Sequence, residues 1–264
     1  ELGAPRVALL NDTAPEMPNG AAGACADIEK GDLILLVGAD PALDQPVASF
    51  FIKRALDKGA RLVIADDQEN GLSPFAWQNM PMSSLDQALE MAGRAVQPVV
   101  LYGKGATAAA VDRLQALAAK AIIIGLEPGV NTRAAKALGF RPGYPTNGAK
   151  FFYFLLGEEK VNDEKILSYM SHDVFIVAQA GFASPLTRRA DVVLPSAIWS
   201  EREGTLTNTE GRVQKAQKAR EAEGDAKPDW EGLALLAEAM GRKLCADLTD
   251  LSAQAIQEIN GKEI

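Results

Sequence analysis

The sequence predicts a doubly wound α/β fold, in which helices cover both faces of a mainly parallel sheet. Two observations lead to this prediction. Short apolar runs rich in β-branched residues recur along the chain, and helical patterns with recognisable ends separate them. The runs are continuously apolar rather than alternating, as a parallel sheet requires when both of its faces are covered.

Seven apolar runs are the predicted strands. They are LILLVG (33–38), RLVIAD (61–66), PVVLYG (98–103), AIIIG (121–125), FFYFLLG (151–157), VFIVAQ (174–179) and DVVLP (191–195). Between the first two runs, Pro46 suits the first turn of a helix that continues to Lys58. Gly59 suits the left-handed residue that ends this helix.

Three further helices have predicted ends. The starts are a capping box of Ser84 with Gln87, a cap at Asn131 and a cap at Asp229; the matching ends are Arg94, Gly139 and Gly241. A polar or small residue at each start and a glycine at two of the ends are typical helix boundaries. Strands and helices therefore alternate along most of the chain.

Composition changes at two places and indicates the domain organisation. RPGYPTNG (141–148) is rich in turn residues, and KAQKAREAEGDAKPD (215–229) is charged. We expect an α/β region over residues 1–220 and a C-terminal helical segment over residues 221–264. The break within 141–150 either divides the α/β region into two lobes or is a crossover loop within one sheet.

The bulk composition excludes several classes of protein. The 264 residues carry 27 Lys and Arg against 35 Asp and Glu, a net charge of -8 that argues against nucleic acid or an anionic membrane as partner. No apolar run reaches the roughly 18 residues that span a bilayer. The start lacks an export pattern and an initiator Met, so we expect a cytoplasmic chain that is processed or is a piece of a longer one.

Autonomous catalysis is not expected from these residues. Cys25 and Cys245 are far apart and have no second cysteine nearby, so there is no CxxC metal or cluster motif. His172 is the only histidine and is interpreted as a strand-entry residue. There is no Ser-His-Asp set, HExxH or Walker loop. We therefore predict no catalytic residue and no metal ligand.

A ligand would lie at the carboxyl ends of the predicted strands, where open parallel sheets bind their ligands. The candidates there are Gly38, Asp40, Asp66, Gly103, Lys104 and Gly105. A Gly-Lys-Gly turn can offer N–H groups and a cation to a phosphate. A glycine turn with a solvent-facing lysine is the commoner explanation, because neither GxGxxG nor GxxxxGK[ST] spacing is present.

A long polar segment follows DVVLP and continues to Gln214. Loops of about fifteen residues within compact domains are usually functional or disordered, and the composition of this one is too specific for simple disorder. Its candidate binding residues are Glu203, Gly204, Thr205, Thr207 and Asn208. The alternative is a polar loop that satisfies its own hydrogen bonds.

Three segments resemble the molybdopterin oxidoreductases. They are VGADPALDQPVASFFIKRALDKGARLVIADD, EPGVNTRAAKALGF and IVAQAGFASPLTRRADVVLPSAIWSEREGTLTNTEGRVQ, of which the last is the most specific. The pattern is nearest to the NADH-quinone oxidoreductase (complex I) and formate dehydrogenase α branches of the family. The resemblance implies a loop over a molybdopterin guanine dinucleotide site, Fe–S clusters in an N-terminal part that this sequence lacks, and other redox subunits as partners, through which the chain could lie at the inner membrane.

Departures from the family pattern weaken the binding of an anion. Asp40 stands where the family has asparagine, and 66–70 reads DDQEN where the family has Asp-Pro-Arg-Arg-Thr. We therefore expect no cofactor bound to this chain, a scaffold role, and Asp66 and Asp67 capping neighbouring turns. Two alternatives are a nucleotide- or thiamine-diphosphate-type central domain, suggested by Gln97 to Ala106, and a non-catalytic interaction module.

Overall fold

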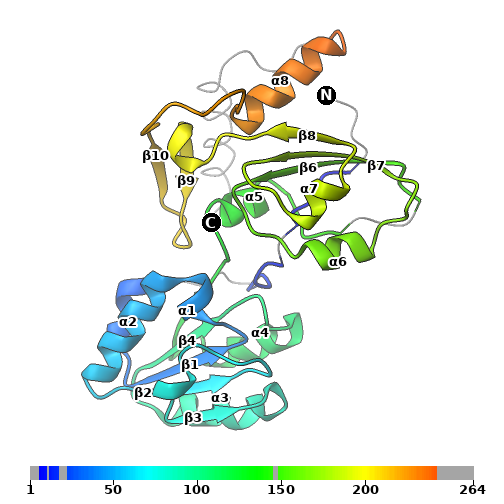
Figure 1. Ribbon diagram of the computed structural model, residues 1–264. Coiled ribbons are helices and arrows are strands. Elements are labelled where there is room, and N and C mark those ends of the chain that lie inside the picture. The colour runs from blue at the N-terminus through cyan, green and yellow to red at the C-terminus, as the bar shows by residue number, and fades with distance from the viewer. Residues whose placement is uncertain (1–5, 11, 18–22, 145–147, 243–264) are drawn as a thin grey trace. The chain divides into compact units, whose positions relative to one another are not determined.

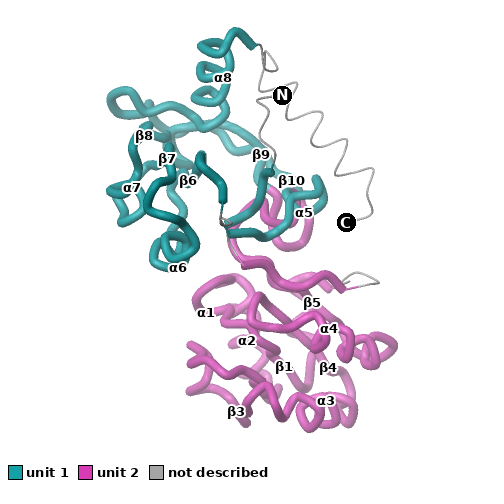
Figure 2. The backbone as a smooth tube through the Cα atoms, turned by 90° about the vertical axis from the view of Figure 1, so that its right-hand side faces the viewer, with its two compact units in different colours: residues 1–11, 135–206, 213–263 teal, residues 12–134, 207–212, 264 magenta. Residues whose placement is uncertain are grey.

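The computed structural model describes residues 6–10, 12–17, 23–144 and 148–242. The chain forms two compact units (Figure 2): within the described residues, unit 2 contains 12–134 and 207–212, and unit 1 contains the rest. No helix among the described residues is long and apolar enough to cross a membrane. Contact-defined units are not independently folding domains, so the division of the chain at residue 220 stays a prediction.

Unit 2 is built on a five-stranded parallel sheet (Figure 1). Its strands are β1 (Leu33–Val37), β2 (Arg61–Ala65), β3 (Gln78–Met80), β4 (Pro98–Tyr102) and β5 (Ile122–Gly125), in the order β3-β2-β1-β4-β5. Each neighbouring pair is parallel. The chain winds outward from β1 in both directions, so the predicted doubly wound α/β class is confirmed.

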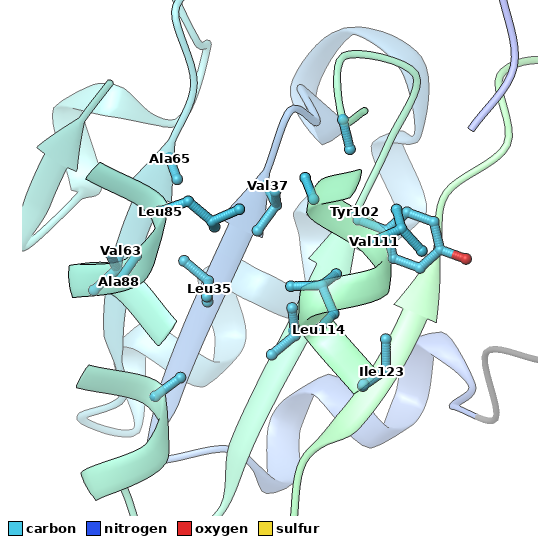
Figure 3. Packing of buried hydrophobic residues seen from close by; sticks show 14 of the residues in the cluster. Leu35, Val37, Val63, Ala65, Leu85, Ala88, Tyr102, Val111, Leu114 and Ile123 are labelled. Atoms are coloured by element: carbon cyan, nitrogen blue, oxygen red, sulfur yellow. The ribbon is translucent and has the colours of Figure 1, made fainter. Parts of the chain in front are cut away.

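Helices cover both faces of this sheet. The α-helices are α1 (Pro41–Asp44), α2 (Pro46–Asp57), α3 (Leu85–Arg94) and α4 (Ala108–Leu114), and the 3-10 helices are η1 (Cys25–Lys30), η2 (Ser73–Phe75), η3 (Met82–Ser84) and η4 (Gln115–Leu117). A further helix, α5 (Thr132–Ala137), begins in unit 2 and ends in unit 1. Alternate residues of β1 belong to opposite cores. Leu35 packs with residues of α3 and α4 (Figure 3), and Ile34 packs with residues of η1 and α2. Continuous apolar runs are the direct consequence.

Unit 1 contains a second parallel sheet. Its strands are β6 (Phe151–Gly157), β7 (Phe175–Ala180) and β8 (Val192–Pro195), in that order, and its helices are α6 (Asp163–Ser168), α7 (Pro185–Arg189), η5 (Trp199–Glu201) and α8 (Asp229–Ala239). Ile176 of β7, Ile166 of α6 and Leu186 of α7 are fully buried together. A two-stranded sheet of β9 (Gly204–Thr207) and β10 (Val213–Ala216) completes the fold.

All seven predicted strands are present within one residue of their predicted limits, but three further strands were missed. The edge strand β3 has only three residues, which is too short to give a pattern. The predicted polar loop is wrong over β9 and β10, because a short hairpin with polar side chains on both faces lacks the alternation that marks a half-buried strand.

The predicted helix ends are correct in part. Gly59 follows α2 with a φ of 97°, and Gly241 follows α8 with a φ of 69°. Ser84 is the N-cap residue of α3 and Arg94 is its last residue, as predicted, but the predicted capping box is wrong, because Ser84 makes no side-chain cap bond. Asp229 is also misplaced: Pro228 is the N-cap residue of α8. The Asp229 carboxylate instead accepts hydrogen bonds from Ser196 and Arg202, which lie outside the helix.

Candidate functional site

The carboxyl ends of β1, β2 and β4 meet at one edge of the unit 2 sheet, as predicted for a ligand site. Gly38 lies immediately after β1, and Gly103 lies immediately after β4. The Gly103 N–H donates to the Val37 carbonyl (3.1 Å), and the Gly38 N–H donates to the Ala65 carbonyl (3.0 Å). The predicted candidates from these strand ends are therefore neighbours in the structure.

Glycines at this edge let two loops pack directly against each other. The Gly105 N–H donates to the Gly38 carbonyl at 2.8 Å. A Cβ on Gly38, whose φ is +53°, would lie 2.3 Å from the Ala106 nitrogen, and a Cβ on Gly103 would lie 2.9 Å from the Ala39 Cβ. Loop packing therefore requires these glycines, whether or not a ligand approaches.

The predicted phosphate donors are engaged within the chain. The Lys104 Nζ lies 2.9 Å from Oδ1 and 2.8 Å from Oδ2 of Asp44 in α1. Thr107 caps α4 by accepting the Ala110 N–H at 3.1 Å. Because the N–H groups of Gly103 and Gly105 are also bonded within the chain, the cation and two amides of the Gly-Lys-Gly turn stabilise the fold.

The acidic side chains at this edge accept backbone N–H groups. Asp66 accepts the Gln68 N–H (2.9 Å), and Asp67 accepts the Met82 N–H (2.9 Å), which confirms the predicted capping of neighbouring turns. The two Asp40 oxygens accept from Ala42 (3.1 Å) and from Gly71 (3.0 Å). Sequence reasoning missed this last link, which joins residues 31 positions apart.

The tip of the β9–β10 hairpin, residues 207–212, belongs to unit 2. Asn208 Oδ1 accepts the N–H groups of Glu210 (3.0 Å) and Arg212 (2.9 Å), so this predicted ligand residue shapes the turn. The Thr207 N–H donates to Asn131 Oδ1 at 2.7 Å, and the Asn131 N–H donates back to the Thr207 carbonyl at 3.0 Å. These bonds favour the alternative of a polar loop whose hydrogen-bonding groups are satisfied within the chain.

The other three predicted residues of this segment lie in unit 1. Glu203 is exposed, whereas Gly204 and Thr205 are half-buried in β9. A Cβ on Gly204 would meet nothing within 4 Å, and its φ is not positive. Neither crowding nor backbone conformation within the described residues requires glycine here. A close approach of another molecule to the backbone would supply a reason.

Two buried titratable groups in unit 2 had no signal in the sequence. The pKa of Tyr102 is raised to about 12, mainly because the side chain is buried and secondly because the negative charge of Glu127 is nearby. The pKa of the Cys25 thiol is raised to about 11, mainly by burial and secondly by the charge and the hydrogen bond of Glu210. Glu210 also accepts the Cys25 N–H at 2.8 Å, which fixes the tip of the hairpin beside η1. The partners are 185 residues apart in sequence, so no local pattern could reveal them.

The carboxyl edge of the unit 1 sheet is held by an ion-pair network. Arg202 donates to both oxygens of Glu158 (3.2 and 3.1 Å) and to Asp229 Oδ2 (3.2 Å). Ser196, just after β8, donates to Asp229 Oδ1 at 2.5 Å. The network explains why Asp229 does not cap its own helix. The Arg202 guanidinium thereby joins the ends of β6 and η5 to the start of α8.

No group of three or more His, Cys, Asp or Glu side chains that could hold a metal ion occurs among the described residues. Cys25 is buried, and the predicted second thiol, Cys245, lies outside them.

Comparison with known proteins decides the family. The molybdopterin oxidoreductase family profile matches residues 9–239. The chain belongs to the molybdopterin oxidoreductase family. It is 40% identical over 94 residues to the F420-dependent formate dehydrogenase 2 subunit alpha of Methanococcus maripaludis, covering 34% of this chain and 14% of that protein.

A second relative matches over most of the chain. The mitochondrial NADH-ubiquinone oxidoreductase 78 kDa subunit of Candida albicans is 30% identical over 241 residues, covering 83% of this chain and 33% of that subunit. The chain thus spans a third or less of these relatives. Among solved structures, acetylene hydratase from Pelobacter acetylenicus matches with a TM-score of 0.45 and 14% identity, over 82% of this chain and 50% of that one.

Proposed function

We propose that this chain is the scaffold region of a redox-complex subunit of the formate dehydrogenase α or complex I type. Its contribution to electron transfer is to hold the subunit's fold and its contacts with partner subunits. We further propose that it binds no pterin dinucleotide at the unit 2 edge and turns over no substrate alone. Family membership and relatives named as subunits support the first part.

The observation that carries the scaffold reading is the use of the candidate phosphate donors within the chain. Lys104 is paired with Asp44, and the Gly105 amide is bonded to Gly38. A pyrophosphate would have to break the ion pair and separate two packed loops. A pyrophosphate there would also approach the carboxylates of Asp40, Asp66 and Asp67. Each contact between like charges at about 4 Å costs on the order of 1 kcal/mol in water and more in a cleft.

Gly204 supplies the test. Because a Cβ there meets nothing within 4 Å, Gly204→Ala should leave the fold unchanged, whereas it would obstruct a ligand that touches the backbone. Calorimetric titration of the purified chain with GDP or pterin dinucleotide should give no saturable binding below millimolar concentration. Micromolar binding that weakens in Gly204→Ala or Thr205→Ala would show that the loop has the cofactor role seen in the family pattern.

The proposal about turnover has a separate measurement. The chain is assayed with formate or NADH and an artificial electron acceptor, with no added subunit. We expect no activity above background, because no group of His, Cys, Asp and Glu side chains in the described part of the chain could hold a metal ion. Reproducible turnover would contradict the proposal that the chain has no activity alone. The scaffold proposal would then depend on the titration with GDP or pterin dinucleotide.

A non-catalytic interaction module remains the second candidate. An exposed group of aromatic side chains on unit 2 favours it. We favour it over the nucleotide- or thiamine-type alternative, because the glycine turn that suggested the latter, at the end of β4, packs on the loop after β1.

A further inference from the structure

One surface of unit 2 exposes three large aromatic side chains. Phe50 of α2, Phe75 of η2 and Trp77 before β3 are 54%, 53% and 54% exposed. Ala76, between the last two, packs into the core, so its neighbours on either side face outward. Contiguous exposed apolar patches commonly mark interaction sites.

A cation lies over each of these rings. The Lys53 Nζ is 5.0 Å from the centre of Phe75, the Arg54 guanidinium is 5.5 Å from Phe50, and the Arg61 guanidinium is 4.7 Å from Trp77. Lys53 links α2 to η2, and this joins the rings into one surface. We call these six residues the aromatic–cation surface.

Two of the three cations lack a carboxylate partner within the described part of the chain. Arg54 is paired with Glu29 at 3.0 Å, and Glu29 also binds Lys58. No ion pair joins Lys53 or Arg61 to any described residue, although Asp57 is exposed one turn after Lys53. The chain as a whole has a net charge of -8. These two positions are therefore able to receive negative charge from another molecule.

We propose that the aromatic–cation surface docks an acidic segment of a partner protein. The segment places an apolar side chain against Phe50 and Phe75 and carboxylates on Lys53 and Arg61. Aromatic residues and arginine are enriched in the buried centres of protein interfaces. The acidic remainder of the chain repels such a segment, so electrostatics favours docking at this surface. The inference does not depend on whether the chain binds a cofactor.

The test uses the complete polypeptide in the cells that produce it. Phe75→benzoylphenylalanine places a photo-crosslinker in the surface, and Val96→benzoylphenylalanine places it at a position 80% exposed outside the surface. Mass spectrometry identifies the crosslinked peptide. We expect position 75, and not position 96, to capture one main segment of another protein in which acidic residues outnumber basic ones.

Charge reversal then tests the role of the cations. In the crosslinking background, Lys53→Glu with Arg61→Glu should lower the yield about tenfold. Lys120→Glu, which removes an exposed lysine elsewhere on unit 2, should not change it. Thermal unfolding checks that each variant folds. Capture of a basic or uncharged segment, of nucleic acid or of a second copy of this chain would overturn the proposal, as would the absence of a crosslink or a yield indifferent to charge reversal.

Discussion

The backbone of Gly38 has a φ of +53°, and a Cβ there would lie 2.3 Å from the Ala106 nitrogen. Gly59 also has a positive φ, 97°, but a Cβ there would meet nothing within 4 Å. Replacing each glycine by alanine therefore distinguishes two losses of stability: the strain of a left-handed backbone, which occurs at both positions, and a clash between packed loops, which occurs only at Gly38.

We expect Gly59→Ala to lower the free energy of unfolding by about 1 kcal/mol, since only the left-handed conformation is penalised. Gly38→Ala adds a clash with backbone atoms and should cost about 3 kcal/mol or more. Urea unfolding of both variants measures the difference. Equal losses would show that the loops after β1 and β4 are not packed as described.

Cys25 gives a pH-dependent prediction at the same scale. Its pKa is raised from 9.0 to about 11, first by burial and then by Glu210. The thiolate is the reactive form, so its population in the folded protein should rise near pH 11 rather than near pH 9. In a Cys245→Ser background, alkylation by iodoacetamide at pH 8 should be on the order of a hundredfold slower than for a free thiol.

Glu210→Gln is the matched variant for this measurement. Glutamine keeps an oxygen that can accept the Cys25 N–H and removes the negative charge. The variant should shift the alkylation profile toward lower pH, while burial keeps it above the profile of a free cysteine. An unchanged profile would show that Glu210 does not act on the thiol.

At the scale of elements, the sequence predicted β1, β2, β4 and β7 because these strands are almost wholly buried, and burial leaves a continuous apolar pattern. The more exposed β8 has the same apolar pattern and was also predicted, whereas the three-residue β3 was too short to give one. Local signals also identified Pro46 and Gly59 at the ends of α2. Elements that are held by distant partners left no such pattern. The β9–β10 hairpin is the main example, because its tip is fixed by Asn131 and by bonds within the turn.

The candidate site shows the same limit. The strand-end rule identified Gly38, Gly103, Lys104 and Asp66 as neighbours at one edge, but the identity of their partners depends on tertiary contacts. The lysine that could have met a phosphate binds Asp44, which lies 60 positions away. Asp40, which replaces an asparagine of the family pattern, binds Gly71 across the same edge.

Asn208 tests whether the hairpin turn is structural. Its side-chain oxygen accepts two backbone N–H groups, each worth about 1 kcal/mol net. Asn208→Ala should therefore lower the stability of unit 2 by about 1–2 kcal/mol, measured by denaturant unfolding. Asn208→Asp keeps the accepting oxygen and should lose less. Equal behaviour of wild type and Asn208→Ala would make this residue a ligand candidate again.

At the scale of the whole molecule, the predicted boundary at residue 220 separates elements that contact each other within unit 1. Asp229, the first residue of α8, binds Ser196 after β8 and Arg202 after η5. A Cβ on Gly232 of the same helix would lie 2.6 Å from the side chain of Gln179 in β7. Helix α8 therefore covers part of the β6–β7–β8 sheet, which would be exposed if the chain ended before it.

Truncation at two positions tests this dependence. We expect a chain that ends at Arg220 to show faster hydrogen exchange in β6, β7 and β8, because it loses α8 and the carboxylate that holds Ser196 and Arg202. Exchange in β1, β2 and β4 should stay close to that of the full chain, since their core lies in unit 2. A chain that ends at Arg242 keeps α8 and is the control for loss of the residues beyond it. Protection of β6–β8 that is unchanged in the shorter chain would instead support a separate C-terminal segment starting at residue 221.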